Sequence, residues 1–351
     1  MTLSLTVDGD RWRTHLHTVA GSTPGLVPVA KGNGYGFGLH RLARKAGWLA
    51  DQGLGGDTLA VGTYEELPEV ASRYAGDLLV LTPWRPFHPA ADPGLAGRLI
   101  HTVSRPQDLA GLLDAVPGAR FVLELETSMR RHGMTAQQLW SAAKLLAGGR
   151  LEGVALHLPL ASGNHLPEVE RRLTDIVAAE LPSGTVWVSH LSPAELATLR
   201  SSYADLTFRP RVGTDLWLGD REALRVTATV LDVHELRRGD TYGYRGRSAP
   251  KNGHLLVVSG GTAHGIGLEA PPGPSDLRTR AKSVARGGLD ALGLTRSPYW
   301  LGGKQLRFAE PPHMQASMLF LPSGVPVPEV GDQAEVRVRY TATAFDRVCV
   351  S

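Results

Sequence analysis

The segment Val27–Gly38 reads V-P-V-A-K-G-N-G-Y-G-F-G and places Lys31 directly after an apolar run. If that run is a barrel strand, the lysine points into the barrel mouth, where the active sites of such folds lie. Partial burial there lowers the pKa of an ammonium group and leaves a nucleophilic amine, which can condense with an aldehyde cofactor. The segment is not a phosphate-binding P-loop, because the lysine precedes the glycines. An exposed lysine before a flexible loop would give the same pattern.

Short apolar runs that could position this lysine recur over the first 220 residues and alternate with longer mixed segments. Eight runs have strand length and lack the polar alternation of exposed strands. They are Leu26–Ala30, Thr58–Val61, Leu78–Leu81, Leu99–Val103, Phe121–Leu125, Val154–His157, Val186–Ser189 and Arg209–Val212. Helix-forming segments lie between them, at His40–Gln52, Tyr64–Tyr74, Gln107–Ala115, Ala136–Leu146, Pro167–Ala179 and Pro193–Ser201. This alternation predicts a parallel (β/α)8 TIM-like barrel, and a doubly wound sheet would fit almost as well.

The pattern changes after about Gly219. Leu224–Val233 alternates apolar and polar residues, and further strand-like runs separated by Gly/Pro turns follow it. We therefore expect two domains, a barrel over 1–221 and a mostly-β C-terminal domain over 222–351. Within the second domain, 270–303 opens with Pro-Pro-Gly-Pro and contains a basic, helix-forming stretch. We interpret it as a surface insertion whose charges form a solvated face rather than a binding patch.

Composition excludes several classes of protein. The 351 residues are 42% hydrophobic and 20% charged, which is ordinary for a globular chain. Cys349 is the only cysteine, so an internal disulfide framework and a multi-cysteine metal site are excluded, and the cytosol is the expected compartment. The net charge of +3 does not indicate a nucleic-acid partner, and no apolar run suggests a membrane span. No metal site is expected.

The lysine segment resembles the motif of the alanine racemase family, fold-type III enzymes that use pyridoxal phosphate (PLP). The family motif reads K-A-N-A-Y-G-H-G, and this chain has K-G-N-G-Y-G-F-G. The resemblance implies that Lys31 holds PLP and that Tyr35 hydrogen-bonds the PLP phosphate. It also implies a barrel followed by a β domain.

Other motifs of the family occur in the same order along the barrel. Glu126–Met134 resembles D-T-G-M-x-R-x-G-F, which places Arg131 where the family's arginine contacts the catalytic tyrosine and the substrate carboxylate. Leu151–His157 resembles L-x-G-I-x-T-H and implies that His157 lies beneath the cofactor. Trp187–Ser192 ends in the serine expected at the phosphate, Ser192.

The resemblance continues at the end of the barrel, over Arg209–Gly219, and then into the β domain. R-P-R-V-G-T-D-L-W-L-G resembles R-P-G-I-x-L-Y-G, which implies Arg211 at the pyridine nitrogen and the amides of Gly213 and Thr214 at the phosphate. G-D-T-Y-G-Y resembles G-x-x-V-S-Y and implies that Tyr244 is the second catalytic base. Met314 takes the position of a substrate-site methionine. The family draws this tyrosine and methionine from a second subunit, so the resemblance implies a homodimer with shared sites.

Each of these residues also has a purely structural interpretation. Arg131 lies in a basic turn that could be solvated, and His157 could be an ordinary core histidine. Tyr244 could cover a hairpin, Ser192 could be a helix N-cap, and Gly213 could be a turn glycine. Their common order and spacing favour the functional interpretation.

The implied chemistry is inversion at the α-carbon of an amino acid by two bases on opposite faces, Lys31 and Tyr244. A phenol with a reference pKa of about 10 needs a neighbouring cation to act as a base, and Arg131 could supply it. Arg211 would leave the pyridine nitrogen unprotonated, which favours return of the proton to the α-carbon over transamination.

Four positions depart from the family pattern. Glu124 stands in place of a commonly carbamylated lysine, and a carboxylate there could still orient Arg131. Thr262 replaces a tyrosine near the entrance, and Gln315 replaces an aspartate beside the substrate. Asp346 or Phe345 falls near the place of a phosphate-contacting tyrosine, and an ionised aspartate cannot donate a hydrogen bond to phosphate.

We therefore expect a PLP-dependent amino-acid racemase, with alanine as substrate only by analogy. Another fold-type III enzyme is an alternative, although arginine at the ring nitrogen argues against a decarboxylase. A metal-assisted D-amino-acid aldolase would need a ligand cluster that we do not find. A non-catalytic relative that binds PLP or a protein partner is the remaining alternative.

Overall fold

The computed structural model describes residues 2–88, 91–160, 163–268 and 296–351, which form two compact units. One unit is Arg13–Gly219, and the other joins the residues up to Trp12 to Asp220–Ser351. This division departs from the expected domains 1–221 and 222–351 at the N-terminus. The first residues belong to the second unit because β1 (Leu3–Val7) pairs with two of its strands.

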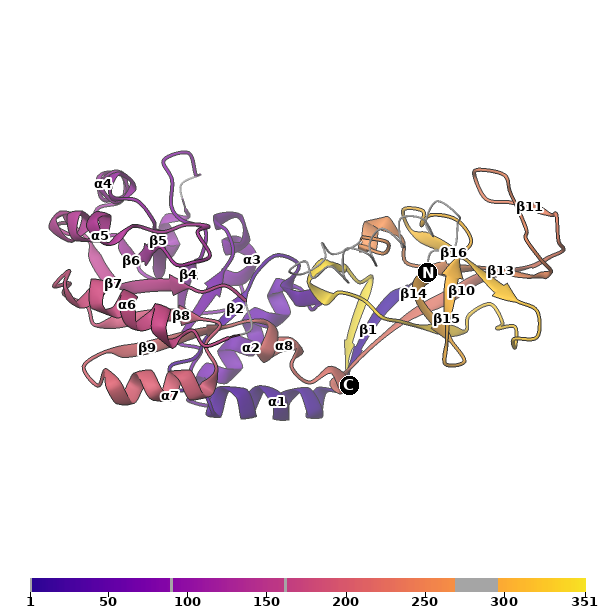
Figure 1. Ribbon diagram of the computed structural model, residues 1–351, viewed down its shortest axis with the longest axis horizontal. Helices are drawn as coiled ribbons and strands as arrows, with labels where there is room; N and C mark the ends of the chain where they lie inside the picture. Colours follow the sequence, from indigo (N-terminus) through magenta and orange to yellow (C-terminus); the bar gives the residue numbers. More distant parts are fainter. Residues whose placement is uncertain (1, 89–90, 161–162, 269–295) are drawn as a thin grey trace. The chain divides into compact units, whose positions relative to one another are not determined.

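The larger unit is a closed barrel of eight parallel strands, so the predicted TIM-like barrel is confirmed and the doubly wound sheet is wrong. Its strands follow one another in sequence order around the barrel (Figure 1). They are β2 (Val27–Ala30), β3 (Thr58–Val61), β4 (Asp77–Val80), β5 (Leu99–Val103), β6 (Arg120–Leu125), β7 (Arg150–His157), β8 (Thr185–Ser189) and β9 (Thr207–Val212).

Helices connect these strands along the outside of the barrel. They are α2 (Leu39–Asp51), α3 (Leu67–Ala71), α4 (Pro106–Ala115), α5 (Ala136–Ala142), α6 (Leu166–Val177) and α7 (Pro193–Ser202), and the short α8 (Thr214–Leu218) follows the last strand, β9. Helix α1 (Gly9–Gly21), which the sequence analysis did not anticipate, begins in the smaller unit and continues into the barrel unit. Among the described residues, no helix is both long enough and apolar enough to cross a membrane.

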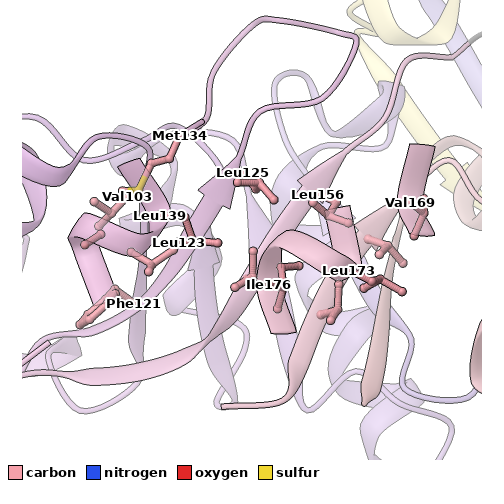
Figure 2. Packing of buried hydrophobic residues seen from close by; sticks show 14 of the residues in the cluster. Val103, Phe121, Leu123, Leu125, Met134, Leu139, Leu156, Val169, Leu173 and Ile176 are labelled. Carbon is pink, nitrogen blue, oxygen red and sulfur yellow. The ribbon is translucent and has the colours of Figure 1, made fainter. Parts of the chain in front are cut away.

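Alternating side chains of the strands fill two separate cores. In β6, Val122 faces the barrel interior with residues such as Val29, Ile100 and Trp187. Its neighbours Phe121, Leu123 and Leu125 face outward and pack against Leu139, Leu173 and Ile176 of the surrounding helices (Figure 2). Burial on both faces explains why these strands have apolar sequences without polar alternation.

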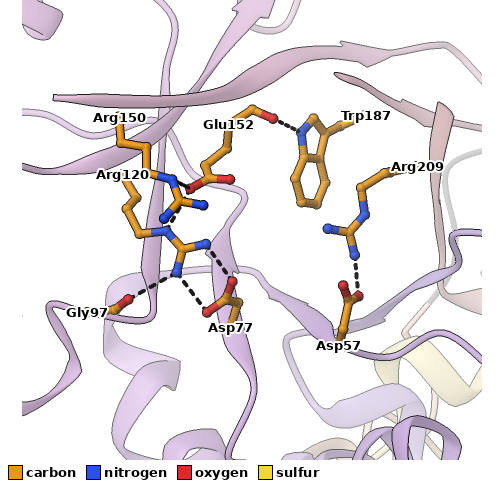
Figure 3. Close-up of polar contacts among 8 residues, drawn as sticks. All are labelled: Asp57, Asp77, Gly97, Arg120, Arg150, Glu152, Trp187 and Arg209. Carbon is orange, nitrogen blue, oxygen red and sulfur yellow. Dashed lines mark hydrogen bonds and ion pairs between the residues drawn. The ribbon is translucent and has the colours of Figure 1, made fainter. Parts of the chain in front are cut away.

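Charged residues close the N-terminal end of the barrel (Figure 3). Arg120 at the start of β6 pairs with Asp77 of β4 at 2.5 Å and with Glu152 of β7 at 2.7 Å. Arg209 of β9 pairs with Asp57 and lies over the ring of Trp187. An ion-pair network occupies this end, and the active sites of such barrels lie at the opposite, C-terminal end.

The smaller unit is built on one eight-stranded sheet in the order β13-β16-β15-β14-β17-β10-β1-β18, with β13 also pairing with β10. All of these pairs are antiparallel except β1 with β18. The mostly-β second domain is thereby confirmed. Its strands are β10 (Leu224–Leu236), β13 (Gly253–Ser259), β14 (Arg296–Leu301), β15 (Lys304–Phe308), β16 (Ala316–Pro322), β17 (Gln333–Val336) and β18 (Arg347–Val350), with the small hairpin β11 (Thr241–Tyr242) and β12 (Arg247–Ser248).

The expected surface insertion over 270–303 needs correction at its end. Most of it, including the basic helix-forming stretch, lies outside the described residues. Residues from Arg296 onward instead form β14, an internal strand of the sheet. The fully buried ring of Tyr299 anchors this strand, and its hydroxyl donates to the carbonyls of Ser259 and Gly260.

Candidate active site

Successive side chains of a β-strand point to opposite faces, so residues two positions apart on a barrel strand point to the same side. Moving two positions along each strand from the interior layer of Val29, Ile100, Val122 and Trp187 reaches the mouth. The residues placed there are Lys31, Gly62, Leu81, Thr102, Glu124, His157, Ser189 and Arg211. Three of the residues that the sequence analysis selected, on β2, β7 and β9, thus belong to one ring.

Lys31 directly follows β2 and remains accessible to solvent. Burial of its ammonium group by the mouth lowers the pKa of Lys31, and the guanidinium groups of Arg131 and Arg211 lower it further, while Glu66 opposes them. Gly62 provides space beside it, because a Cβ built on this glycine would lie 3.0 Å from Cβ of Lys31. The lysine therefore stands in an electropositive mouth that favours its neutral, nucleophilic form.

Glu66 fixes the backbone around the lysine. Its carboxylate accepts hydrogen bonds from the amides of Gly32 and Gly62, both at 2.7 Å. It comes from a capping box with Thr63 at the start of a 3-10 turn. Sequence reasoning missed Glu66, although the T-Y-E-E segment carries the capping-box signature that could have found it.

Tyr35 lies in the glycine-rich loop with φ of 55°, a left-handed conformation that is uncommon for a residue with a bulky side chain. Its ring is buried, and burial raises the pKa of its hydroxyl, which keeps the group protonated as a hydrogen-bond donor. The hydroxyl rests against Gly213, where a Cβ would overlap it. The loop after β2 and the turn after β9 thus converge on one spot.

Arg211 and Glu124 are both buried in the mouth. Arg211 donates from Nη2 to the carbonyl of Leu156 at 2.9 Å, and its Nε has no hydrogen-bond partner among the described residues. Burial lowers the pKa of Arg211 to about 10, so it stays cationic at neutral pH. Burial raises the pKa of Glu124, which Arg211 and Arg131 partly offset, and its Oε2 also lacks a partner in the described structure.

His157 ends β7 and is oriented from both sides. Its Nδ1 lies 2.7 Å from the hydroxyl of Ser189 on β8, and its carbonyl accepts from Thr127 at 2.6 Å. Burial, reinforced by Arg211 and Arg131, lowers the pKa of His157 to about 3, so the imidazole is neutral. His190, which sequence reasoning missed, has its ring centroid 5.1 Å away and a φ of 62°.

Arg131 is exposed in the loop that follows β6. This loop folds back on its strand. The amide of Met134 donates to the backbone carbonyl of Glu124, and the amide of Glu126 donates to the carbonyl of Met134, both at 2.8 Å. Gly133 permits the close approach, because a Cβ there would overlap the backbone of Glu126. Arg131 comes near enough to lower the pKa values of Lys31 and His157.

The residues expected at a phosphate lie at the starts of two helices. Ser192 is the N-cap of α7, which agrees with its structural interpretation as a helix cap. Its hydroxyl donates to the carboxylate of Glu195 at 2.8 Å. Gly213 is the N-cap of the short α8, and the exposed Thr214 is its first residue. An anion would find backbone amides at Gly213 and Thr214, while Ser192 would have to exchange its contact with Glu195.

Tyr244 and Met314 belong to the smaller unit, where their side chains are 87% and 72% exposed. Tyr244 lies in the loop of the β11–β12 hairpin. The carbonyl of His313 accepts a hydrogen bond from the amide of Thr262 at 2.8 Å. The carbonyl of Met314 accepts one from the amide of Ala263 at 2.9 Å. Thr262 and Gln315, two departures from the family pattern, therefore lie on neighbouring stretches of chain.

Asp346, a third departure, has two structural partners. Its Oδ1 lies 3.0 Å from Nε2 of His264, and its Oδ2 accepts from the amide of Leu3 at 2.8 Å. Hydrogen bonds from His264 and Leu3 outweigh the opposing effect of burial and lower the pKa of Asp346. The carboxylate therefore joins the start of β1 to the loop after β13.

The barrel mouth suits an anionic aromatic cofactor better than a metal ion. The described residues contain no group of three or more His, Cys, Asp or Glu side chains that could hold a metal. Arg211 offers an unpaired buried Nε–H to a ring nitrogen, Tyr35 and Gly213 form a cradle, and Lys31 supplies an amine. These features fit PLP.

Comparison with known proteins agrees with this geometry. Residues 7–218 match the family model "Alanine racemase, N-terminal domain". By sequence comparison, no curated protein matches the chain.

Similar solved structures cover nearly the whole chain. Alanine racemase from Bartonella henselae "with covalently bound pyridoxal phosphate" has a TM-score of 0.72 at 17% identity, covering 100% of both chains. The biosynthetic alanine racemase of Pseudomonas aeruginosa has a TM-score of 0.67 at 23% identity, covering 97% of this chain and 91% of that one. The enzyme from Streptomyces lavendulae has a TM-score of 0.69 at 19% identity, covering 100% and 97%. At these identities the likeness establishes the fold.

Proposed function

The chain belongs to the alanine racemase family, and on that premise we propose that it is a PLP-dependent racemase that interconverts L- and D-amino acids. One observation carries the proposal. A lysine whose pKa is lowered shares the barrel mouth with a buried arginine whose Nε–H has no partner in the described structure. An aldehyde cofactor of this kind requires a reactive amine, which Lys31 offers. It also requires a hydrogen-bond donor for its ring nitrogen, which Arg211 offers.

Each mouth residue then has an assigned role toward PLP. Lys31 would hold the aldehyde group through its amine, Arg211 would donate to the ring nitrogen, and His157 would contact the ring. Tyr35 and Ser192 would hold the phosphate by their hydroxyls, and Gly213 and Thr214 would hold it by their amides. When bound, PLP acidifies the α-hydrogen of the amino acid.

Two residues of the chain exchange the proton at the α-carbon. Lys31 serves one face and Tyr244 serves the other, because inversion requires a base on each side. Arg131 holds the substrate carboxylate, for which a guanidinium is a natural partner. Met314 borders the amino-acid side chain.

Arg211 favours racemisation over other outcomes. Its pKa of about 10 keeps it cationic at neutral pH, so it does not protonate the ring nitrogen. Arg211 would thereby keep the electron withdrawal of a bound ring weak, which would favour return of the proton to the α-carbon.

Alanine is the substrate by analogy with the structural relatives, and the changes at Thr262 and Gln315 leave room for another amino acid. We further propose a homodimer in which the barrel of one copy and Tyr244 and Met314 of the other complete each site. The large exposed fractions of these two side chains in the single chain support this arrangement.

Hydrogen exchange at the α-carbon tests the proposal. Protein loaded with PLP is incubated with individual L-amino acids in heavy water, and both enantiomers are analysed by chiral separation and mass spectrometry. Deuterium in both enantiomers of one amino acid supports a racemase and identifies its substrate. If the protein carries borohydride-fixable PLP on Lys31 but exchanges no hydrogen, the non-catalytic alternative replaces the racemase.

A further inference from the structure

Tyr244, the base proposed for one face of the substrate, stands over a pair formed by a buried carboxylate and a partly exposed imidazole. Glu310 is only 3% exposed and accepts a 2.6 Å hydrogen bond from Nε2 of His313. The His313 ring lies with its centroid 4.6 Å from that of Tyr244 at an interplanar angle of 46°. All three residues belong to the smaller unit, and neither Glu310 nor His313 has a role in the mechanism above.

One carboxylate oxygen holds both parts of this arrangement. Oε1 of Glu310 accepts from His313 and also from the backbone amide of Tyr244, at 3.3 Å. A buried carboxylate requires such partners, because its desolvation would otherwise be costly. The position of the Tyr244 backbone and the position of the ring beside it are therefore set by the same atom.

The chain before Tyr244 is shaped to reach that carboxylate. Gly243 has a φ of 74°, which favours glycine, and a Cβ there would overlap the carboxylate of Glu310. The hairpin loop therefore presses its backbone directly onto the Glu310 side chain. Any larger residue at this position would lift Tyr244 away.

The segment that carries the imidazole is equally constrained. Pro311 and Pro312 separate Glu310 from His313 and restrict the backbone between the two partners. The amide of His313 donates to Ala316 at 2.9 Å, and its carbonyl accepts from Thr262 at 2.8 Å. His313 is thus held by contacts that do not involve Tyr244.

Tyr244 itself has few other constraints. Its side chain is 87% exposed, and the strands of its hairpin are only two residues long. Among the described residues, the tilted His313 ring is the one aromatic group in ring contact with it. An exposed tyrosine on a short hairpin would sample many orientations, and a base must be held close to one.

We propose that Glu310 and His313 are positioning residues that orient Tyr244 for proton transfer at the α-carbon. This inference rests on the proposed racemase function. The pair acts through the phenol and does not touch the substrate. Its loss should impair proton transfer on the Tyr244 face and leave the Lys31 face able to exchange.

The variants His313→Phe, His313→Gln and Glu310→Gln test this role, with Tyr244→Phe as the reference. His313→Phe keeps an aromatic ring without the hydrogen bond, and His313→Gln keeps a polar group without the ring. His234→Gln is the matched control, because His234 is an exposed histidine 3.4 Å from Asp232 in the same unit. If Glu310→Gln does not fold, the two His313 variants carry the test.

Exchange is measured separately for each enantiomer in heavy water. We expect the His313 variants to lose racemisation roughly ten- to hundredfold in kcat, with little change in KM, as a small misplacement of a catalytic group does. Exchange should continue for the one enantiomer that Tyr244→Phe still exchanges. Equal loss for both enantiomers, or variants as active as wild type, would overturn the inference.

A second readout does not depend on turnover. The chain has eight tyrosines, so ring-labelled protein gives few signals, and Tyr244→Phe identifies the one of interest. That signal should move in His313→Gln and Glu310→Gln but not in His234→Gln, and an unmoved signal contradicts the positioning role. A wild type that exchanges no amino acid overturns the racemase proposal together with this inference, whereas an active wild type with unaffected variants overturns this inference alone.

Discussion

Burial at the barrel mouth shifts four titratable side chains toward their neutral forms. It lowers the pKa values of Lys31, Arg211 and His157 and raises the pKa of Glu124. The arginines lower the pKa of Lys31 further, so burial and charge act in the same direction on the proposed nucleophile. The same arginines keep the mouth electropositive, which suits an anionic cofactor.

His157 should make stability depend on pH. Its pKa is about 3 in the folded chain and about 6.5 when unfolded, so its contribution is present above about pH 6.5 and is lost as pH falls toward 3. Replacing it by glutamine removes this term. Urea unfolding at a series of pH values should show the stability difference between wild type and His157→Gln shrinking as the solution is acidified. Parallel curves would contradict a neutral buried imidazole.

The contact between Tyr35 and Gly213 offers a test of the proposed phosphate cradle. In Gly213→Ala the new Cβ overlaps the tyrosine hydroxyl, and we expect PLP binding to weaken roughly tenfold or more. Equilibrium dialysis measures the affinity. Gly97→Ala is the matched control, because a Cβ on Gly97 meets nothing within 4 Å. Equal affinity of the two variants for PLP would place the phosphate elsewhere.

The sequence predicted individual mouth residues better than their surroundings. Lys31 could be found because a lysine at the end of an apolar run, before closely spaced glycines, is a local pattern. Glu66, His190 and the Glu310–His313 pair were missed because their meaning depends on contacts with other segments. His190 lies 32 positions from the carbonyl that its Nδ1 contacts, and no local pattern marks that pairing.

At the scale of elements, the ion pairs at the closed end of the barrel should contribute unequally to stability. Arg120 joins three strands, and its side chain is 13% exposed, whereas Arg150 contacts the same Glu152 with a side chain that is 69% exposed (Figure 3). We expect Arg120→Gln to lower the free energy of unfolding by about 3 kcal/mol, because it leaves the half-buried Asp77 without its ion pair and Glu152 with the exposed Arg150 alone. Arg150→Gln should cost less than about 1 kcal/mol. Denaturant unfolding compares them, and similar losses would show that burial does not set their strength.

The strands of the barrel were predicted well because both of their faces are buried, which gives continuous apolar runs. Strands β3 and β5 have the bounds expected from the sequence. Strand β14 was hidden, since it follows a basic stretch and contains a proline at position 298. Only the fit of Tyr299 into the sheet reveals it.

At the scale of the whole chain, the expected domains placed the N-terminus in the wrong unit. Strand β1 alternates Leu3, Leu5 and Val7 with polar residues and could have been recognised as half-buried. Its partners β10 and β18 begin more than 200 residues later. A sequence pattern can indicate that a strand has one buried face, but it does not say which sheet covers that face.

The proposed sharing of sites between two copies predicts that two inactive variants restore each other. Lys31→Ala lacks the nucleophile and Tyr244→Phe lacks the opposite base, so each alone should be inactive as a racemase. In a mixed dimer, the intact Lys31 of one copy meets the intact Tyr244 of the other, which gives one working site. Half of the dimers are mixed after random reassembly, so about a quarter of wild-type activity should return, given a two-fold symmetric dimer. Dissociation, mixing and dialysis followed by a racemisation assay measure this recovery. If both residues of a site came from the same copy, no mixture of the two variants would contain an intact pair and none would recover activity.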